Sequence, residues 1–126
     1  MSELEFLRII EVLRELPRRK VRRVLEQSKH RFWFEEITYV ACLFLENETD
    51  RCLIYPVRPL ICRIFGRVKH LPCPIEHCPT DIDARDLLRS YSELPLHTFQ
   101  QWMIRHYMFN FDDLLGIKEA PVRIEI

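Results

Sequence analysis

The chain has 126 residues, of which 48% are hydrophobic and 30% are charged. This length suits one compact domain, and the composition indicates a globular chain, not a disordered one. The 19 Lys and Arg residues balance the 19 Asp and Glu residues, which removes the overall charge that favours nucleic-acid binding. The two glycines exclude a glycine-rich phosphate loop, and the lack of a long apolar run predicts no membrane-spanning helix.

The N-terminal sequence predicts the cellular compartment of the protein. The start, MSELEFLRII, has acidic residues where a signal peptide carries basic ones, and no small-residue cleavage site follows it. We therefore expect a cytoplasmic protein. A framework of disulfides is not expected, because that compartment is reducing.

The first elements in chain order are two helices. Ser2 and Glu5 form a capping-box pattern, and the apolar residues that follow recur at helical spacing. Pro17 ends this helix or opens the next one. Residues 18–29 are good helix formers with a narrow apolar stripe, so they predict a second helix that is basic and mostly exposed.

The middle of the chain predicts a hairpin and a short helix. Residues 37–46 and 51–55 are rich in β-branched, aromatic and aliphatic side chains, and a short polar stretch separates them. This pattern predicts two strands joined by a loop of about four or five residues. Residues 59–65 predict a short helix, with Pro59 in its first turn and Gly66 after its end.

Helical patterns return in the last third of the chain. Thr80 resembles a helix start, and Pro95 is expected to open a longer helix. Residues 112–115 predict a single turn that Gly116 caps. The tail, PVRIEI, alternates like a short edge strand.

These elements predict a fold that is mainly α with a small β-hairpin (α+β), built as one domain over residues 1–126. We expect a helical pair at about 3–30, a cysteine-rich metal-binding core at about 37–80, and C-terminal helices at about 81–115. The helices would pack around a metal or cluster site that cysteines hold.

Five cysteines fall between positions 42 and 78, and none occurs elsewhere: Cys42, Cys52, Cys62, Cys73 and Cys78. Buried free cysteines would explain any one position but not the clustering. The odd number and the lack of a signal peptide count against a disulfide framework. A metal or iron–sulfur site needs three or four thiolates from different segments, which this distribution supplies. The spacing matches neither a common zinc finger nor a ferredoxin, so it does not identify the metal.

The predicted hairpin suggests how the thiols could converge. Cys42 and Cys52 would lie on the same face of adjacent strands as diagonal neighbours, about 7–8 Å apart, which is long for a disulfide but acceptable around a metal. Cys62 would lie in the first turn of the next helix, where the helix dipole stabilises a thiolate. Cys73 or Cys78 would complete the site. His77 is a further candidate, although a surface histidine is the simpler interpretation.

A longer pattern, CLFLENETDRCLIYPVRPLICRIFG, covers residues 42–66. It resembles the core of the CxxCxxCC family of zinc- or iron-chelating proteins. The matching residues are Cys42, Leu45, Arg51, Cys52, Ile54, Tyr55, Arg58, Pro59, Cys62 and Arg63. Leu43 replaces the family's usual proline, and the upstream cysteine cluster that gives the family its name is absent. The resemblance implies that the cysteines bind zinc or an iron–sulfur cluster. We favour a cluster of the 4Fe-4S type.

Arg58 and Arg63 are the candidate cofactor-binding residues outside the cysteines. They could donate hydrogen bonds to cluster sulfides or to carbonyl oxygens of the hairpin. The alternative is a salt bridge to Glu35, Glu36 or Glu46.

Three classes of function stay open from the sequence. A small metal-centre protein with a structural, electron-transfer or sensing role is favoured. A cluster-dependent enzyme or accessory subunit, acting in methyl transfer or redox chemistry, is the alternative, although no set of catalytic residues stands out. An interaction module would use the basic helix at 18–31 to contact a protein partner, with nucleic acid less favoured. The aromatic residues 32–34 after that helix could stack on bases, but an apolar anchor for the helices is the simpler interpretation.

Overall fold

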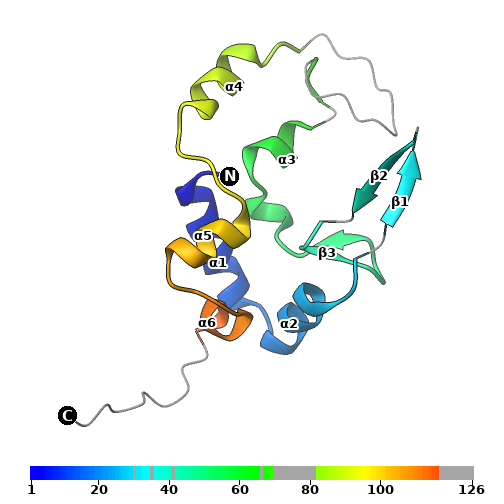
Figure 1. The fold of residues 1–126 in the computed structure, drawn as a ribbon, viewed down its shortest axis with the longest axis vertical. Coiled ribbons are helices and arrows are strands. Elements are labelled where there is room, and N and C mark those ends of the chain that lie inside the picture. Colours follow the sequence, from blue (N-terminus) through cyan, green and yellow to red (C-terminus); the bar gives the residue numbers. More distant parts are fainter. Residues whose placement is uncertain (30, 35, 41, 66, 70–81, 117–126) are drawn as a thin grey trace, which may run out of the picture.

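A computed structural model describes residues 1–29, 31–34, 36–40, 42–65, 67–69 and 82–116 of the chain (Figure 1). The described helices and strands are, in order, α1 (Glu3–Glu15), α2 (Arg18–Glu26), β1 (Arg31–Phe34), β2 (Ile37–Val40), β3 (Leu45–Glu46), β4 (Arg51–Cys52), the 3-10 helix η1 (Tyr55–Val57), α3 (Leu60–Ile64), α4 (Arg85–Ser92), α5 (Phe99–Arg105) and α6 (Phe111–Leu115). The prediction of a mainly helical chain with a small antiparallel β element is therefore confirmed. The tail strand and the Gly66 cap lie outside the described residues.

Helix α1 begins at the predicted capping box. The Ser2 hydroxyl accepts a hydrogen bond from the Glu5 backbone at 3.3 Å, and the Ser2 backbone donates to the Glu5 carboxylate at 2.9 Å. These two bonds satisfy donors that a helix start would otherwise leave unpaired. The helix packs against α2, α5, α6 and η1, so it is the central element of the fold.

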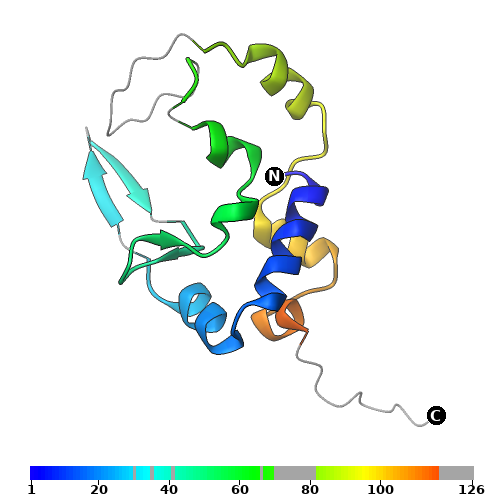
Figure 2. The ribbon, with the colours of Figure 1, turned by 180° about the vertical axis from the view of Figure 1, so that it is seen from behind.

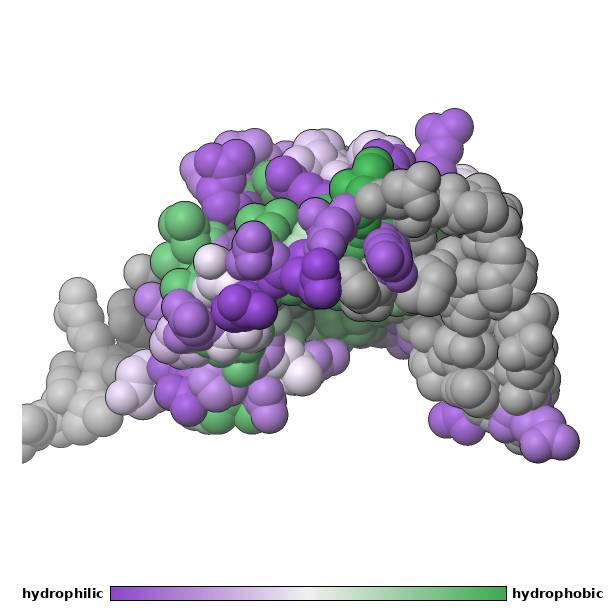
Figure 3. All heavy atoms as spheres, turned by 90° about the horizontal axis from the view of Figure 1, so that it is seen from above, coloured by the Kyte–Doolittle hydropathy of each residue, from purple (hydrophilic) through white to green (hydrophobic). Residues whose placement is uncertain are grey.

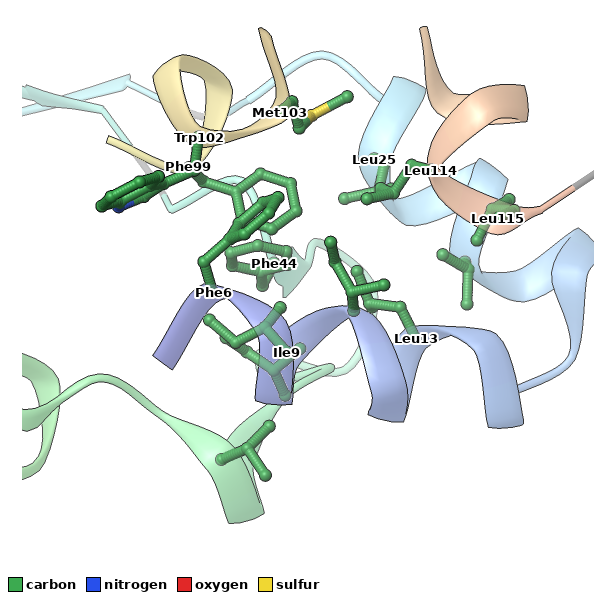
Figure 4. Close-up of a cluster of buried hydrophobic side chains, with 14 residues drawn as sticks. Phe6, Ile9, Leu13, Leu25, Phe44, Phe99, Trp102, Met103, Leu114 and Leu115 are labelled. Atoms are coloured by element: carbon green, nitrogen blue, oxygen red, sulfur yellow. The ribbon is translucent and has the colours of Figure 1, made fainter. Parts of the chain in front are cut away.

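The core forms where α1 meets α5, α6 and the β3 segment (Figure 4). Phe6 points from α1 toward an aromatic group, and its ring centroid lies 5.2 Å from that of Phe99. Phe44 meets Phe99 edge-on at 4.9 Å. The indole of Trp102 donates to the carbonyl oxygen of Met1 at 2.8 Å, which satisfies its polar group inside the core. Burial of these large rings supplies much of the energy that holds α1 to α5.

Helix α5 begins later than the sequence predicted. Pro95 does not open α5, because Thr98 caps it instead. Its hydroxyl accepts from the Gln101 backbone at 3.2 Å, and the Thr98 backbone N–H donates to the Gln101 side-chain oxygen at 2.9 Å. This is a second capping box, which the sequence also carries. The predicted turn before Gly116 is confirmed as α6, and Gly116 ends it with a φ of 70°.

Helix α4 begins at Arg85, later than Thr80 suggested, and Thr80 itself lies outside the described residues. None of the residues of α4 is buried. The helix lies apart from the α1–α5–α6 group, at the top of Figure 1.

The predicted hairpin between residues 37–46 and 51–55 is confirmed only next to its loop, where β3 pairs with β4, and is wrong for residues 37–40. Residues 37–46 do not form one strand, because Ile37–Val40 turns back onto Arg31–Phe34 as the antiparallel pair β2–β1. Glu36 has a positive φ of 66° in the tight turn between them. The second pair, β3–β4, is only two residues long, and it places Leu45 opposite Cys52. Its loop of four residues, 47–50, agrees with the predicted loop length. Both hairpins lie on the side of the molecule away from α5 and α6 (Figures 1 and 2).

The described surface exposes several large apolar side chains between polar ones (Figure 3). The most exposed are Tyr107, Leu4 and Phe109, at 82%, 72% and 70%. Of the helices that the structure describes, none combines the length and the apolar character needed to cross a bilayer.

Candidate functional site

Three of the five predicted cysteines lie in described residues, each in a different part of the fold. Cys42 precedes β3, and its carbonyl oxygen accepts a hydrogen bond from the Leu45 backbone at 3.0 Å. Cys52 ends β4, and Cys62 lies in the middle of α3. Cys73 and Cys78 lie outside the described residues.

The expected diagonal relation between Cys42 and Cys52 is wrong. The register pairs Cys52 with Leu45, so Cys42 lies three residues before the partner of Cys52 and outside the strand. A diagonal neighbour would be two residues away. The prediction failed because it counted Cys42 as part of one continuous strand, whereas the chain leaves β2 at Val40 and begins β3 at Leu45.

Buried neighbours fix the segment that carries Cys52. Phe44 and Ile54, on either side of the β3–β4 pair, are 4% and 2% exposed and belong to the main core. The Leu53 backbone donates to the Phe44 carbonyl at 2.8 Å, which holds the two segments together. Cys52 itself is half-buried against the same core.

The three described thiols influence one another electrostatically. Burial raises the pKa of Cys52, and negative charge at Cys42 raises it further. Partial desolvation of its sulfur also raises the pKa of Cys62, although the residue is exposed, and charges at Cys42 and Cys52 add to this rise. The helix dipole was expected to stabilise a thiolate at Cys62, but these effects outweigh it on a helix of only five residues. The raised pKa values mean that Cys52 and Cys62 hold their protons more tightly than a free thiol does, and a metal would have to displace those protons.

The three described cysteines form no disulfide. Their donor chemistry fits zinc or iron, because thiolates are soft ligands. Their present arrangement is not a finished ligand set, since no three His, Cys, Asp or Glu side chains in the described part of the chain form a group that could hold a metal ion.

A backbone hydrogen bond brings together the two ends of the segment that carries Cys73 and Cys78. The Lys69 backbone donates to the Ile82 carbonyl at 2.8 Å. The flanking residues Val68 and Ala84 are buried, at 5% and 8% exposure. Lys69 and Ile82, which precede and follow this segment in the sequence, are therefore neighbours in the structure.

Arg58 and Arg63 brace the turn between β4 and α3. The Arg58 guanidinium lies 3.9 Å from the centroid of the Tyr55 ring and donates to the Tyr55 carbonyl. Arg63 donates to the carbonyl oxygens of Arg58, at 2.8 Å, and Pro56, at 3.3 Å. The positive charge of Arg58 acts against the rise in the pKa of both Cys52 and Cys62, which places it near both thiols.

The sequence also suggested that Arg58 and Arg63 could form salt bridges. Neither forms one with a described acidic residue. Glu46 is buried and instead pairs with Lys20 and Arg23 of α2. Neither arginine pairs with Glu36, and Glu35 lies outside the described residues.

Glu5 holds α3 in place, a role that the sequence did not reveal. Its carboxylate accepts hydrogen bonds from the Ser2 backbone, from the Leu60 backbone at 2.6 Å and from the Tyr91 hydroxyl. Burial alone would raise the pKa of Glu5, but these hydrogen bonds outweigh it and lower the pKa. One side chain of α1 therefore positions both α3, which carries Cys62, and α4.

Lys29 holds the Cys42 segment in a similar way. Its ammonium donates to the carbonyl oxygens of Val24 at 2.7 Å and Leu43 at 2.6 Å. Burial lowers the pKa of Lys29, and negative charge at Cys42 acts against that change. The end of α2 is thereby tied to the residue next to Cys42.

Ion pairs within the molecule use much of the basic charge on α2. Lys20 and Arg23 reach Glu46, and Arg22 reaches Glu26 and Asp112. Arg18 and Arg19 make no ion pair with any described residue. The aromatic residues 32–34 form strand β1.

Together these features define a small, mainly helical protein with free thiols, Cys52 and Cys62, on either side of a braced turn. The chain belongs to the CxxCxxCC family, whose model, described as "Putative zinc- or iron-chelating domain", matches residues 9–86. The match covers more than half of the chain, from the middle of α1 into α4, and it supports metal binding. Searches of curated proteins and of solved structures gave no match.

Proposed function

We propose that this protein binds zinc or iron through cysteine thiolates, in the second case most simply as a 4Fe-4S cluster. The observation that supports this best is that charge at Cys42 acts on the thiols of both Cys52 and Cys62. The three cysteines come from three separate segments, all are free, and the charge of one raises the pKa of another. Free thiols are soft donors, and in a family whose domain is described as zinc- or iron-chelating they are suited to a soft metal.

The proposed ligands are Cys42, Cys52 and Cys62, with Cys73 or Cys78 as the fourth. A fourth thiolate is needed because the described donors alone form no group that could hold a metal. The contact between Lys69 and Ile82 supports a donor from the intervening sequence, since it joins the described residues on either side of it. His77, next to Cys78 in the sequence, is the alternative fourth ligand.

Arg58 and Arg63 are proposed to stabilise the centre without binding the metal. A bound cluster or a set of thiolates carries negative charge, and Arg58 already acts electrostatically on two of the thiols. We assign the chain as a single domain in a reducing compartment such as the cytoplasm, which keeps thiols available. The metal would supply structural stability, electron transfer or sensing, and no catalytic residue is assigned.

Elemental analysis tests the proposal directly. Protein purified without oxygen should contain zinc or iron in a fixed ratio to the chain. An iron–sulfur cluster adds visible absorbance and acid-labile sulfide, whereas zinc leaves the protein colourless. Protein that contains neither metal after purification, and takes up neither when supplied with iron and sulfide or with zinc, would refute the proposal.

Contact with an acidic protein partner through residues 18–31 is a weaker second candidate. The exposed arginines Arg18 and Arg19 favour it, while the internal ion pairs of Lys20, Arg22 and Arg23 count against it. Replacing both exposed arginines with glutamine should abolish such binding without altering metal content.

A further inference from the structure

An open pocket of about 200 Å³ lies where α1 packs against η1. Its lining comes from α1, from the end of η1, from α3 and from the residue Arg58 between them. The lining residues are Leu4, Glu5, Arg8, Val57, Arg58, Leu60 and Arg63.

Three arginines line this small space, and none of them pairs with a carboxylate of the described residues. Arg8 makes no hydrogen bond or ion pair with any residue that the structure describes. Arg58 and Arg63 donate to backbone carbonyl oxygens, which carry no formal charge. Like charges gathered without a counter-ion repel one another, so a bound anion would stabilise the arrangement.

Glu5 is the one acidic side chain in the lining, and it is already engaged. It accepts from the Ser2 backbone, the Leu60 backbone and the Tyr91 hydroxyl. Its carboxylate therefore has little capacity left to bind the arginines. Three positive charges against one negative charge leave the pocket with an excess of two.

We propose that this pocket binds the phosphoryl group of a small phosphomonoester. A phosphoryl dianion matches the excess charge, and its oxygens can accept the forked donors of guanidinium groups. Leu4, Val57 and Leu60 provide apolar walls that suit the organic part of an ester. Metal binding is not required for this site, because no cysteine lines it.

Calorimetric titration of the whole chain with phenyl phosphate, at constant ionic strength and near pH 7.5, tests this site. Inorganic phosphate serves as the second probe. Binding should saturate at one phenyl phosphate per chain, and phenyl phosphate should bind more tightly than inorganic phosphate because its ring contacts the apolar walls. Equal affinity would overturn the assignment of an ester, and the absence of saturable binding by either probe would overturn the site.

Two arginine variants distinguish specific binding in the pocket from nonspecific electrostatic attraction of the anion to the protein. Arg8→Ala should weaken phenyl phosphate binding about tenfold, as expected for one charge-assisted hydrogen bond. Arg19→Ala removes the same charge from an exposed position on α2 outside the pocket, and it should leave the affinity unchanged. Equal weakening in both variants would contradict the proposal. Arg8 is exposed on α1, so its replacement should not disturb folding.

Discussion

Tyr91 in α4 donates a hydrogen bond to the carboxylate of Glu5 in α1, across 86 positions of sequence. Helix α4 buries none of its own residues, so this bond is a major attachment of the helix to the described fold. The same carboxylate binds the backbone at the start of α3. Helices α3 and α4, which flank the segment with Cys73 and Cys78, are therefore positioned by one side chain.

We expect Tyr91→Phe to loosen α4. The change removes one charge-assisted hydrogen bond at a half-exposed position, so the free energy of unfolding should fall by about 1 kcal/mol. Urea denaturation gives the energy, and hydrogen exchange should show faster exchange of the α4 amides. Tyr107→Phe is the matched control, because Tyr107 is 82% exposed and should change neither measurement. Unchanged α4 exchange in the Tyr91 variant would contradict the assigned attachment.

Glu5 should make stability depend on acid pH. Its pKa in the folded protein lies below the ordinary value of 4.5, so the unfolded chain binds the proton first. The stabilisation is complete above pH 4.5 and is lost as the pH falls through the lower folded pKa.

The difference in unfolding free energy between the wild type and Glu5→Gln should therefore be constant above that range and shrink below it. Denaturant titrations at several pH values measure this difference. Glu11→Gln, on an exposed position of the same helix, should show no such change. If the difference in unfolding free energy between the wild type and Glu5→Gln stays constant down to pH 2, the role of Glu5 is disproved.

Serine variants of Cys52 and Cys62 should separate metal binding from packing. Both should lose metal content and the thermal stability that the metal supplies, which for structural zinc is on the order of 10 kcal/mol. Without metal, Cys62→Ser should change stability by less than about 0.5 kcal/mol, because the residue is exposed. Cys52→Ser should cost more, because its side chain packs against the core. Full metal occupancy together with unchanged melting in both variants would refute their assignment as ligands.

Lys29→Met should destabilise the segment next to Cys42. Methionine keeps much of the apolar stem but removes the ammonium that binds the Val24 and Leu43 carbonyl oxygens. The expected loss in unfolding free energy is about 1–3 kcal/mol. Lys69→Met, at an exposed position, is the control for loss of charge. Equal stabilities of the two variants in urea would show that the Lys29 contacts contribute little.

Elements set by local chemistry could be predicted from the sequence. The capping box at Ser2 and the glycine after α6 act over a few residues, so their patterns located the ends of α1 and α6. The β1–β2 pair could not be located, because hydrophobic composition alone does not say which neighbour a strand chooses. Because of that error, the prediction placed Cys42 in a strand, whereas it lies between β2 and β3.

The candidate site was predictable only in part for a related reason. The sequence identified the cysteines through clustering and family resemblance, and the turn arginines through their place in the motif. It could not identify Glu5 or Lys29, whose partners Leu60 and Leu43 lie 55 and 14 positions away. Glu5 was assigned only its local capping role, which the structure retains beside the distant one.

The bond between Lys69 and Ile82 has a consequence for how this protein could change over time. A stretch that begins and ends at the same point of a scaffold tolerates insertion and deletion, since each doubling of its length costs only about 0.6 kcal/mol in closure entropy. New donor side chains could therefore be gained or discarded there while the surrounding helices keep their places.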